Sequence, residues 1–292
     1  ASNNTAVGHN TLKANTTGDE NTAVGAASLD ANTTGHSNVA VGVSALSSNT
    51  TAAKNTAVGR LALRDNTTGA NNTSLGHQSM LVNTTGYDNV AVGRNALDAN
   101  VGGHSNTALG ESSLTSNTEG DRNVAVGQNA LAVNTTGVEN IAIGRNALDA
   151  NTTASNNVAV GDSALTANTT GQYNTALGHA ALLANTTGEN NTAIGQGTAE
   201  KLTTGAQNTA IGHRAMNNGT VTGIDNTALG RSAGYNLSSG SNNLLLGHDA
   251  GFTGSPGGNN TTGSNAIFLG DENIGDAHIQ VDWTVASDQR DK

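Results

Sequence analysis

The stretch Asn4-Thr5-Ala6-Val7-Gly8 decides the fold of this chain, because it returns after a fixed interval of 17 residues. The next copies are Asn21-Thr22-Ala23-Val24-Gly25 and Asn38-Val39-Ala40-Val41-Gly42. With these three, thirteen copies run without a slip, and their leading Asn residues stand at positions 4, 21, 38, 55, 72, 89, 106, 123, 140, 157, 174, 191 and 208. Looser copies begin at Asn226, Asn243 and Asn265. A short fixed period is typical of solenoids, in which each repeat stacks on its neighbours.

One strand of each repeat follows from the alternation of side-chain size. Counted from the leading Asn, the consensus is N-T-A-V-G-x-x-A-L-x-x-N-T-T-G-x-x. Positions 2 and 4 hold Thr, Val, Ile or Leu and share one side of a strand, whereas position 3 is almost always Ala. We interpret this pattern as a strand whose large residues face a core and whose Ala face meets a close neighbour.

The rest of the repeat predicts a second strand and two corners. Position 5 is Gly throughout, and position 9 is Leu or Met in the regular copies except at Ala199. A second short strand is predicted to run from there into the Asn-Thr-Thr-Gly corner. Seventeen residues are too few for a βαβ crossover, so we expect an all-β, parallel β-solenoid with one coil per repeat. With strands about 4.8 Å apart, sixteen coils make a rod on the order of 75 Å long, along which Asn side chains form hydrogen-bonded columns.

Breaks in the repeat divide the chain into three parts. Residues 1–251 form the β-solenoid of 17-residue repeats, and residues 252–264 form an inserted loop that contains the only Pro. Residues 265–292 contain the last coil, a terminal strand predicted at 279–285, and a closing segment. Because the first repeat begins almost at once, we expect the chain to be a piece of a longer protein.

Composition excludes several classes of partner and site. The net charge of −10 argues against a nucleic-acid surface, which needs clustered Lys and Arg. The chain has no Cys, so disulfide bridges and thiolate metal sites are excluded. No stretch approaches the run of about 18 apolar residues that a membrane-spanning helix needs. Stability is therefore expected to come from the stacking of coils.

Residues with catalytic or metal-binding chemistry are too far apart to act together. Five His residues share position 6 but never occupy adjacent coils, so the closest pair is roughly 10 Å apart at the strand spacing, too far to share a zinc ion. Asp30, Asp98 and Asp149 share position 10, also without neighbours. A glycosidase would need two carboxylates in one cleft. We expect no enzymatic activity, cofactor or metal.

The Asn-x-Ala-Val/Ile-Gly unit resembles the head repeats of trimeric autotransporter adhesins of the YadA type, although their coil is slightly shorter. The resemblance covers nearly the whole chain and implies a left-handed β-roll that packs as a homotrimer. It also implies that the small Ala side chains let three rolls approach one another. The expected trimer contacts are Ala6, Ala23, Ala40, Ala57, Ala91 and Ala108.

The closing residues of the chain carry a second resemblance. The segment Trp283-Thr284-Val285-Ala286-Ser287-Asp288-Gln289-Arg290-Asp291-Lys292 looks like the junction that opens the intramolecular chaperone of phage tail fibres and endosialidase-type tailspikes. In that family the chaperone assembles the trimer and is released by self-cleavage at a Ser-Asp bond. By resemblance, the cleavage site is Ser287-Asp288, and the chain is the fibre that remains.

Together these patterns predict a structural protein: the homotrimeric shaft of a virus tail fibre, located in the virion tail, that projects a receptor-binding tip for host attachment. Phe252 and Trp283 are the candidate contacts to a cell-surface receptor. A bacterial cell-surface adhesin head is one alternative. An ice-binding solenoid is another, because one Thr rank repeats at the strand spacing, although Val101, Gly102 and Glu119 interrupt the corner; its members include Thr16, Thr33, Thr50, Thr67 and Thr84.

Overall fold

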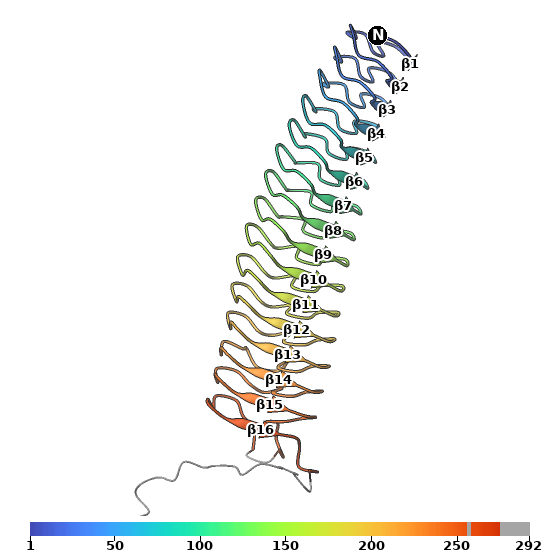
Figure 1. The fold of residues 1–292 in the computed structure, drawn as a ribbon. Helices are drawn as coiled ribbons and strands as arrows, with labels where there is room; N and C mark the ends of the chain where they lie inside the picture. Colours follow the sequence, from blue (N-terminus) through green and yellow to red (C-terminus); the bar gives the residue numbers. More distant parts are fainter. Residues whose placement is uncertain (256–257, 275–292) are drawn as a thin grey trace, which may run out of the picture.

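The computed structural model describes residues 1–255 and 258–274, which form a long rod with its N-terminus at one end (Figure 1). Within these residues, sixteen parallel strands form one sheet in the order of the sequence. The strands are β1 (Thr5–Val7), β2 (Thr22–Val24), β3 (Val39–Val41), β4 (Thr56–Val58), β5 (Thr73–Leu75), β6 (Val90–Val92), β7 (Thr107–Leu109), β8 (Val124–Val126), β9 (Ile141–Ile143), β10 (Val158–Val160), β11 (Thr175–Leu177), β12 (Thr192–Ile194), β13 (Thr209–Ile211), β14 (Thr227–Leu229), β15 (Leu244–Leu246) and β16 (Ile267–Leu269).

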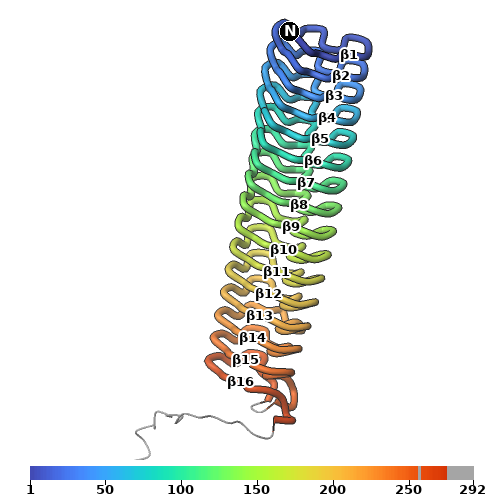
Figure 2. Tube along the Cα trace, turned by 45° about the vertical axis from the view of Figure 1, so that its right-hand side comes forward, coloured from blue at the N-terminus to red at the C-terminus, as the bar shows by residue number. Residues whose placement is uncertain are grey.

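Each coil contributes one strand, and the strands stack along one side of the rod (Figure 2). The register joins equivalent positions of successive repeats; Thr5, for example, pairs with Thr22, and Ala6 with Ala23. The predicted parallel β-solenoid with a 17-residue coil is therefore confirmed. No helix that could cross a bilayer occurs in the part of the chain that the structure describes.

The predicted second strand is wrong. The segment around position 9 forms turns, and its Leu residues have left-handed backbone conformations, with φ of 53° at Leu131 and 54° at Leu148. Such a conformation costs an L-residue roughly 1–2 kcal/mol. Burial of the Leu side chain, which contributes about 1.5–3 kcal/mol, offsets that cost. A backbone hydrogen bond to the next coil stabilises the conformation further; the Leu148 amide, for example, donates to the carbonyl of Ala164 at 3.1 Å.

The core of the roll is formed by the same small set of residues from every coil. In most coils position 9 supplies a buried Leu or Met, and positions 3 and 8 supply small residues that leave room for it. In the central coil that carries β9, these residues are Ala142, Ala147 and Leu148, all 0% exposed. Because one coil is only one residue layer thick, each Leu is buried only through the coils on either side.

Two columns of buried Asn side chains connect the coils, as predicted. At position 12, Asn151 donates from Nδ2 to Oδ1 of Asn134 in the preceding coil at 2.9 Å. At position 1, the backbone amide of Asn157 donates to Oδ1 of Asn140 at 3.1 Å. Both columns also donate to the carbonyl oxygen at position 15, as Asn151 does to Ala154 at 3.0 Å. These bonds satisfy polar groups that would otherwise be costly to bury.

The position-12 column ends where apolar residues replace Asn. Leu202, Val221 and Leu237 are buried at the corresponding corner of the next coils. Asn185 therefore closes the column, and among the described residues its Oδ1 has no hydrogen-bond partner. In two of these coils the residue at position 9 is smaller, Ala199 and Gly234, so apolar volume moves there from position 9 to the corner. The coil between them keeps Met216 at position 9.

The last repeat differs from the prediction in two respects. Its strand is aligned so that Ala266, rather than Asn265, takes the place of the leading Asn, and the Ala266 amide donates to Asn243 Oδ1 at 3.0 Å. Asn260 to Gly263, assigned to the inserted loop, form the usual corner: Ser238 donates to the Thr261 carbonyl at 2.7 Å. The terminal strand predicted at 279–285 lies outside the described residues.

Candidate functional site

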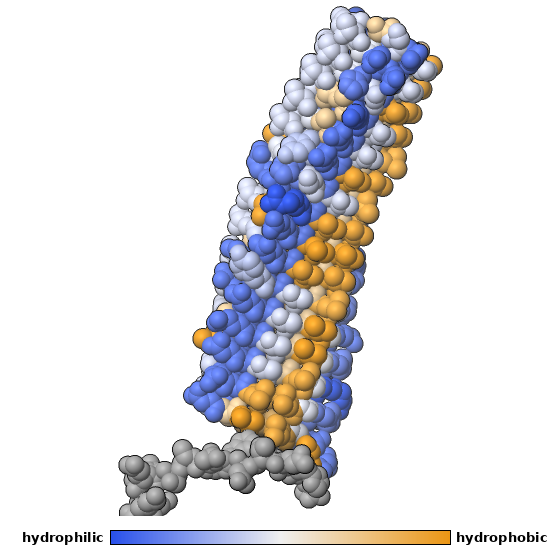
Figure 3. All heavy atoms as spheres, in the orientation of Figure 1, coloured by the Kyte–Doolittle hydropathy of each residue, from blue (hydrophilic) through white to orange (hydrophobic). Residues whose placement is uncertain are grey.

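The outward side of the strands carries apolar side chains over the whole length of the rod. In β1–β16 the third residue is always Val, Leu or Ile, and the first is Thr, Val, Ile or Leu. We call these outward residues the apolar stripe; it forms the orange band in Figure 3. Many of them are half exposed, including Leu75 at 47%, Leu177 at 45% and Leu229 at 48%. An exposed apolar surface of this length is unusual in a monomeric soluble protein and makes the stripe a candidate interaction surface.

The Ala residues predicted as trimer contacts point the other way. Ala23, Ala40, Ala57, Ala91 and Ala108 are 0% exposed in the single chain and belong to its core. Ala6 is exposed, because β1 has a neighbouring strand on one side only. The assignment was wrong because the large Leu at position 9 fills the roll and leaves space for only a methyl group opposite. The Thr and Val columns assigned to the interior form the apolar stripe instead.

Charged side chains line both edges of the apolar stripe. We call the residue two positions before each strand its leading-edge residue and the residue two positions after each strand its trailing-edge residue. Ion pairs join successive coils along each edge: Arg122 Nε lies 2.9 Å from Glu139 on the leading edge, and Arg145 lies 2.9 Å from Asp162 on the trailing edge. A hydrogen bond from Ser163 and the Arg145 guanidinium lower the pKa of the Asp162 carboxyl. Exposed pairs of this kind add little stability.

The threonine rank considered for ice binding uses its hydroxyl hydrogens inside the protein. Thr33 donates from Oγ1 to the carbonyl of Thr50 at 3.0 Å, and Thr84 donates to the carbonyl of Val101 at 3.2 Å. The rank is therefore a structural ladder whose hydroxyl donors are occupied. Only its lone pairs and methyl groups remain available to water.

The position-6 His residues lie on the trailing edge, separate from one another. Those with a charged neighbour contact residues of adjacent coils: His77 lies 3.2 Å from Arg60, and His248 lies 2.9 Å from Asp271. Across the described ranges, no group of three or more His, Cys, Asp or Glu side chains is placed to hold a metal ion.

A small hollow lies beside Phe252 near the C-terminal end of the rod. Phe252 and Tyr235 occupy position 10 of adjacent coils, and their rings meet edge to face with centroids 5.5 Å apart. The hollow has a volume of about 260 Å³ and is lined by His213, Arg214, Arg231, Ser232, Tyr235, Asp249 and Phe252. The shared repeat position could have identified Tyr235 from the sequence. Trp283, Ser287 and Asp288 lie outside the described residues.

Asp149 gives the rod a testable dependence on pH. Burial raises the pKa of its carboxyl, and a hydrogen bond from the Ala150 amide opposes this shift. Since the folded chain holds this proton more tightly than the unfolded chain, stability falls as pH rises through the folded pKa and stays lower at neutral pH. We expect Asp149→Asn to raise the denaturant midpoint at neutral pH but not in acid well below the ordinary pKa of 3.8.

The exposed Asp162 provides the control with the opposite sign. Its pKa is lowered in the folded chain, so its ionised form contributes stability at neutral pH that is lost in acid. Asp162→Asn should therefore lower the midpoint at neutral pH. If both variants shift the midpoint in the same direction, the electrostatic account of Asp149 is wrong.

Neither the protein-family models nor the curated proteins with which the chain was compared give a match.

Proposed function

We propose that the chain is a shaft segment of a homotrimeric fibre, the shaft of a virus tail fibre that projects a receptor-binding tip toward the host cell. The observation that carries this proposal is the apolar stripe, which continues without a charged residue from β1 to β16. A single partner that covers the whole stripe must be as long as the rod itself. Two further copies of the chain, arranged around a common axis, meet that requirement.

The proposed trimer explains how a thin rod becomes a stiff one. Each copy turns its apolar stripe toward the axis, so the half-exposed Val, Leu and Ile side chains become buried against those of the other copies. This burial contributes on the order of 1 kcal/mol for each side chain. Contacts of this kind in every coil resist bending and local opening. The resemblances to trimeric adhesin heads and to the fibre junction favour three copies over two.

The mass in solution tests the proposal. Light scattering should give three times the chain mass of 29.0 kDa. The double variant Ile143→Glu, Leu177→Glu should be monomeric with an unchanged circular-dichroism spectrum, because both side chains are exposed in the single chain. The matched control is Thr153→Glu, Thr187→Glu, which places the same charges on another exposed corner of the same coils. A stripe variant that assembles like the control would contradict the proposal.

The two alternatives predict different outcomes. A monomeric unmodified chain would contradict the fibre and favour the ice-binding alternative, which recrystallisation inhibition would test. A bacterial surface adhesin would share the trimer, and immunogold labelling of virions against bacterial cells distinguishes these two locations. The occupied Thr hydroxyl donors favour the fibre over ice binding.

A further inference from the structure

We infer that the charges along the two edges of the apolar stripe fix how neighbouring copies align: parallel, with each strand beside the same strand of the next copy. This inference rests on the proposed fibre and adds the polarity and register of its contacts. The stripe itself cannot supply that information, because Val, Leu or Ile recurs in every coil. If one copy of the ring slips by one coil, one of its two contacts is offset forward and the other backward. Such a slip would cost the apolar contacts little.

The geometry of a cyclic assembly determines which edges meet. When identical rods surround an axis parallel to their length, the leading edge of one copy faces the trailing edge of the next. With no offset, the two residues that flank one strand come together between copies. In an antiparallel, face-to-face pair, equal edges would meet instead.

With no offset, three strands bring opposite charges together. They are β6 with Asp88 and Arg94, β9 with Glu139 and Arg145, and β14 with Asp225 and Arg231. Only β4 brings like charges together, through Lys54 and Arg60. The balance is three favourable contacts against one unfavourable contact.

An offset of one coil is worse in either direction. If each leading-edge residue faces the trailing-edge residue of the following strand in the next copy, every charged pair has like charges. These pairs are Asp88 with Glu111, Arg122 with Arg145, and Glu139 with Asp162. If it faces the trailing-edge residue of the preceding strand instead, a single opposite pair remains, Arg122 with Glu111.

Offsets of two coils do not recover the balance. In the forward direction two opposite pairs meet two like pairs, and in the backward direction one opposite pair meets two like pairs. Like charges that face each other across a contact disfavour the wrong alignment even where each correct pair contributes little.

Two of the acids involved have no ion-pair partner inside the single chain. Asp88 and Asp225 are exposed on the leading edge, and neither forms an ion pair within residues 1–255 and 258–274. Their carboxylates are thus available to a cation from another copy. Arg94 and Arg231, the cations that flank the same strands, are also exposed. Within the single chain Arg94 forms an ion pair with Glu111, and Arg231 contacts His248, so each would share its guanidinium with the acid of another copy.

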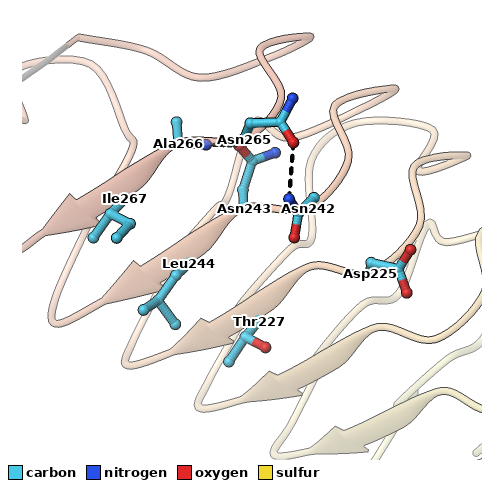
Figure 4. A pocket seen from close by; sticks show the side chains of 8 residues that line it. All are labelled: Asp225, Thr227, Asn242, Asn243, Leu244, Asn265, Ala266 and Ile267. Carbon is cyan, nitrogen blue, oxygen red and sulfur yellow. Dashed lines mark hydrogen bonds between the residues drawn. The ribbon is translucent and has the colours of Figure 1, made fainter. Parts of the chain in front are cut away.

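A groove beside Asp225 offers space for that cation (Figure 4). It has a volume of about 360 Å³, and one wall is formed by Asp225, Asn242 and Asn265. Thr227, Leu244 and Ile267 form the opposite, mostly apolar wall. An Arg side chain fits both walls, because its methylene stem can lie on apolar surface while its guanidinium pairs with the carboxylate. In the aligned assembly this side chain is Arg231 of the next copy.

Cysteine cross-linking measures the register directly, since the chain contains no Cys. Asn190 and Gln196 flank β12 and are both exposed. The variant Asn190→Cys, Gln196→Cys should form disulfide-linked trimers faster than two shifted pairs. These are Asn190→Cys with His213→Cys, and Asn190→Cys with His179→Cys, which place one thiol a single coil forward or back. Light scattering of each reduced variant gives the mass before oxidation.

The outcomes separate the inference from the proposed fibre. If the mass is trimeric but a shifted pair cross-links fastest, or no pair cross-links, the inferred register is wrong. The proposed fibre is then not contradicted. A monomeric mass of the unmodified chain overturns both. A charge exchange at β14 adds an independent check: Asp225→Arg and Arg231→Asp should each slow assembly at low salt, and the two together should restore it. Failure of the double variant to recover overturns the inference.

Discussion

Replacing Gly178 with alanine should destabilise the rod by about 3–5 kcal/mol. Gly178 has a φ of 133°, a region that L-residues rarely adopt. A Cβ atom there would also lie 2.6 Å from the carbonyl oxygen of Gly195 in the next coil. Relief of that clash requires the coil spacing to change, which would stretch hydrogen bonds on every side of the roll.

The second corner of the same coil supplies the control. Gly188 is more buried than Gly178, and a Cβ atom there would lie 2.2 Å from the carbonyl oxygen of Gly205. It does not have a left-handed φ, however, and its position is occupied by Ala52 and Ala154 in other coils. Gly188→Ala should therefore cost clearly less than Gly178→Ala. Chemical denaturation followed by circular dichroism gives both values. Equal losses for the two variants would mean that backbone conformation is not what requires Gly at position 5.

Placing a leucine at Ala142 should cost about 3 kcal/mol by overpacking the roll. Ala142 lies in the core beside the Leu148 column and has no exposed surface. The effect should appear as loss of folding stability, measured by denaturant midpoint at fixed protein concentration. An exposed Ala column, by contrast, would have produced a change of mass only.

The chain itself indicates how this overpacking can be relieved. In β15 the inward residue is Leu245, and the position-9 residue of that coil is Gly251, where any side chain would collide with Leu245 Cδ2. We expect Leu148→Gly, which alone costs several kcal/mol through the cavity it leaves, to cost much less in combination with Ala142→Leu. Additive losses in this double-mutant cycle would show that the two side chains do not share one space.

The sequence was sufficient to predict the period, the first strand, its register and the Asn columns. Each of these features follows from local spacing: Asn at position 1 must repeat at 17 residues if successive coils share a ladder, and the structure places Asn140 and Asn157 in that relation. Once the coil length is set, a parallel in-register stack allows only one pairing of successive strands. The pattern therefore determines the architecture.

The inside of the roll could not be predicted in the same way. An alternating Thr-Ala-Val segment defines two faces but does not say which face is enclosed. That depends on the far wall, where Leu148 points inward from a left-handed residue. Conformational propensities predict extended structure for such a segment, because the left-handed region is unfavourable for Leu. The left-handed conformation of Leu148 follows only from the packing of the complete coil.

The strand was therefore identified correctly, but its outward and inward faces were exchanged in the prediction. Val and Ile columns were assigned to the core, although Ile143 is 40% exposed. The edge charges were visible in the sequence as well, but their relation to a contact surface depends on knowing that positions 2 and 4 face outward. The pairing of Tyr235 with Phe252, by contrast, could have been predicted, because both residues occupy position 10 of successive repeats.

The Asn columns also give the rod a direction of growth. In the position-12 column every side chain donates to the coil before it, so the last Asn always presents an unused oxygen toward the coil that follows; Asn151, for example, leaves its Oδ1 for Asn168. A ribosome releases the chain in that same order. Each newly released coil thus meets a finished surface with acceptors already in position, and the completed part of the rod acts as a template for the next layer.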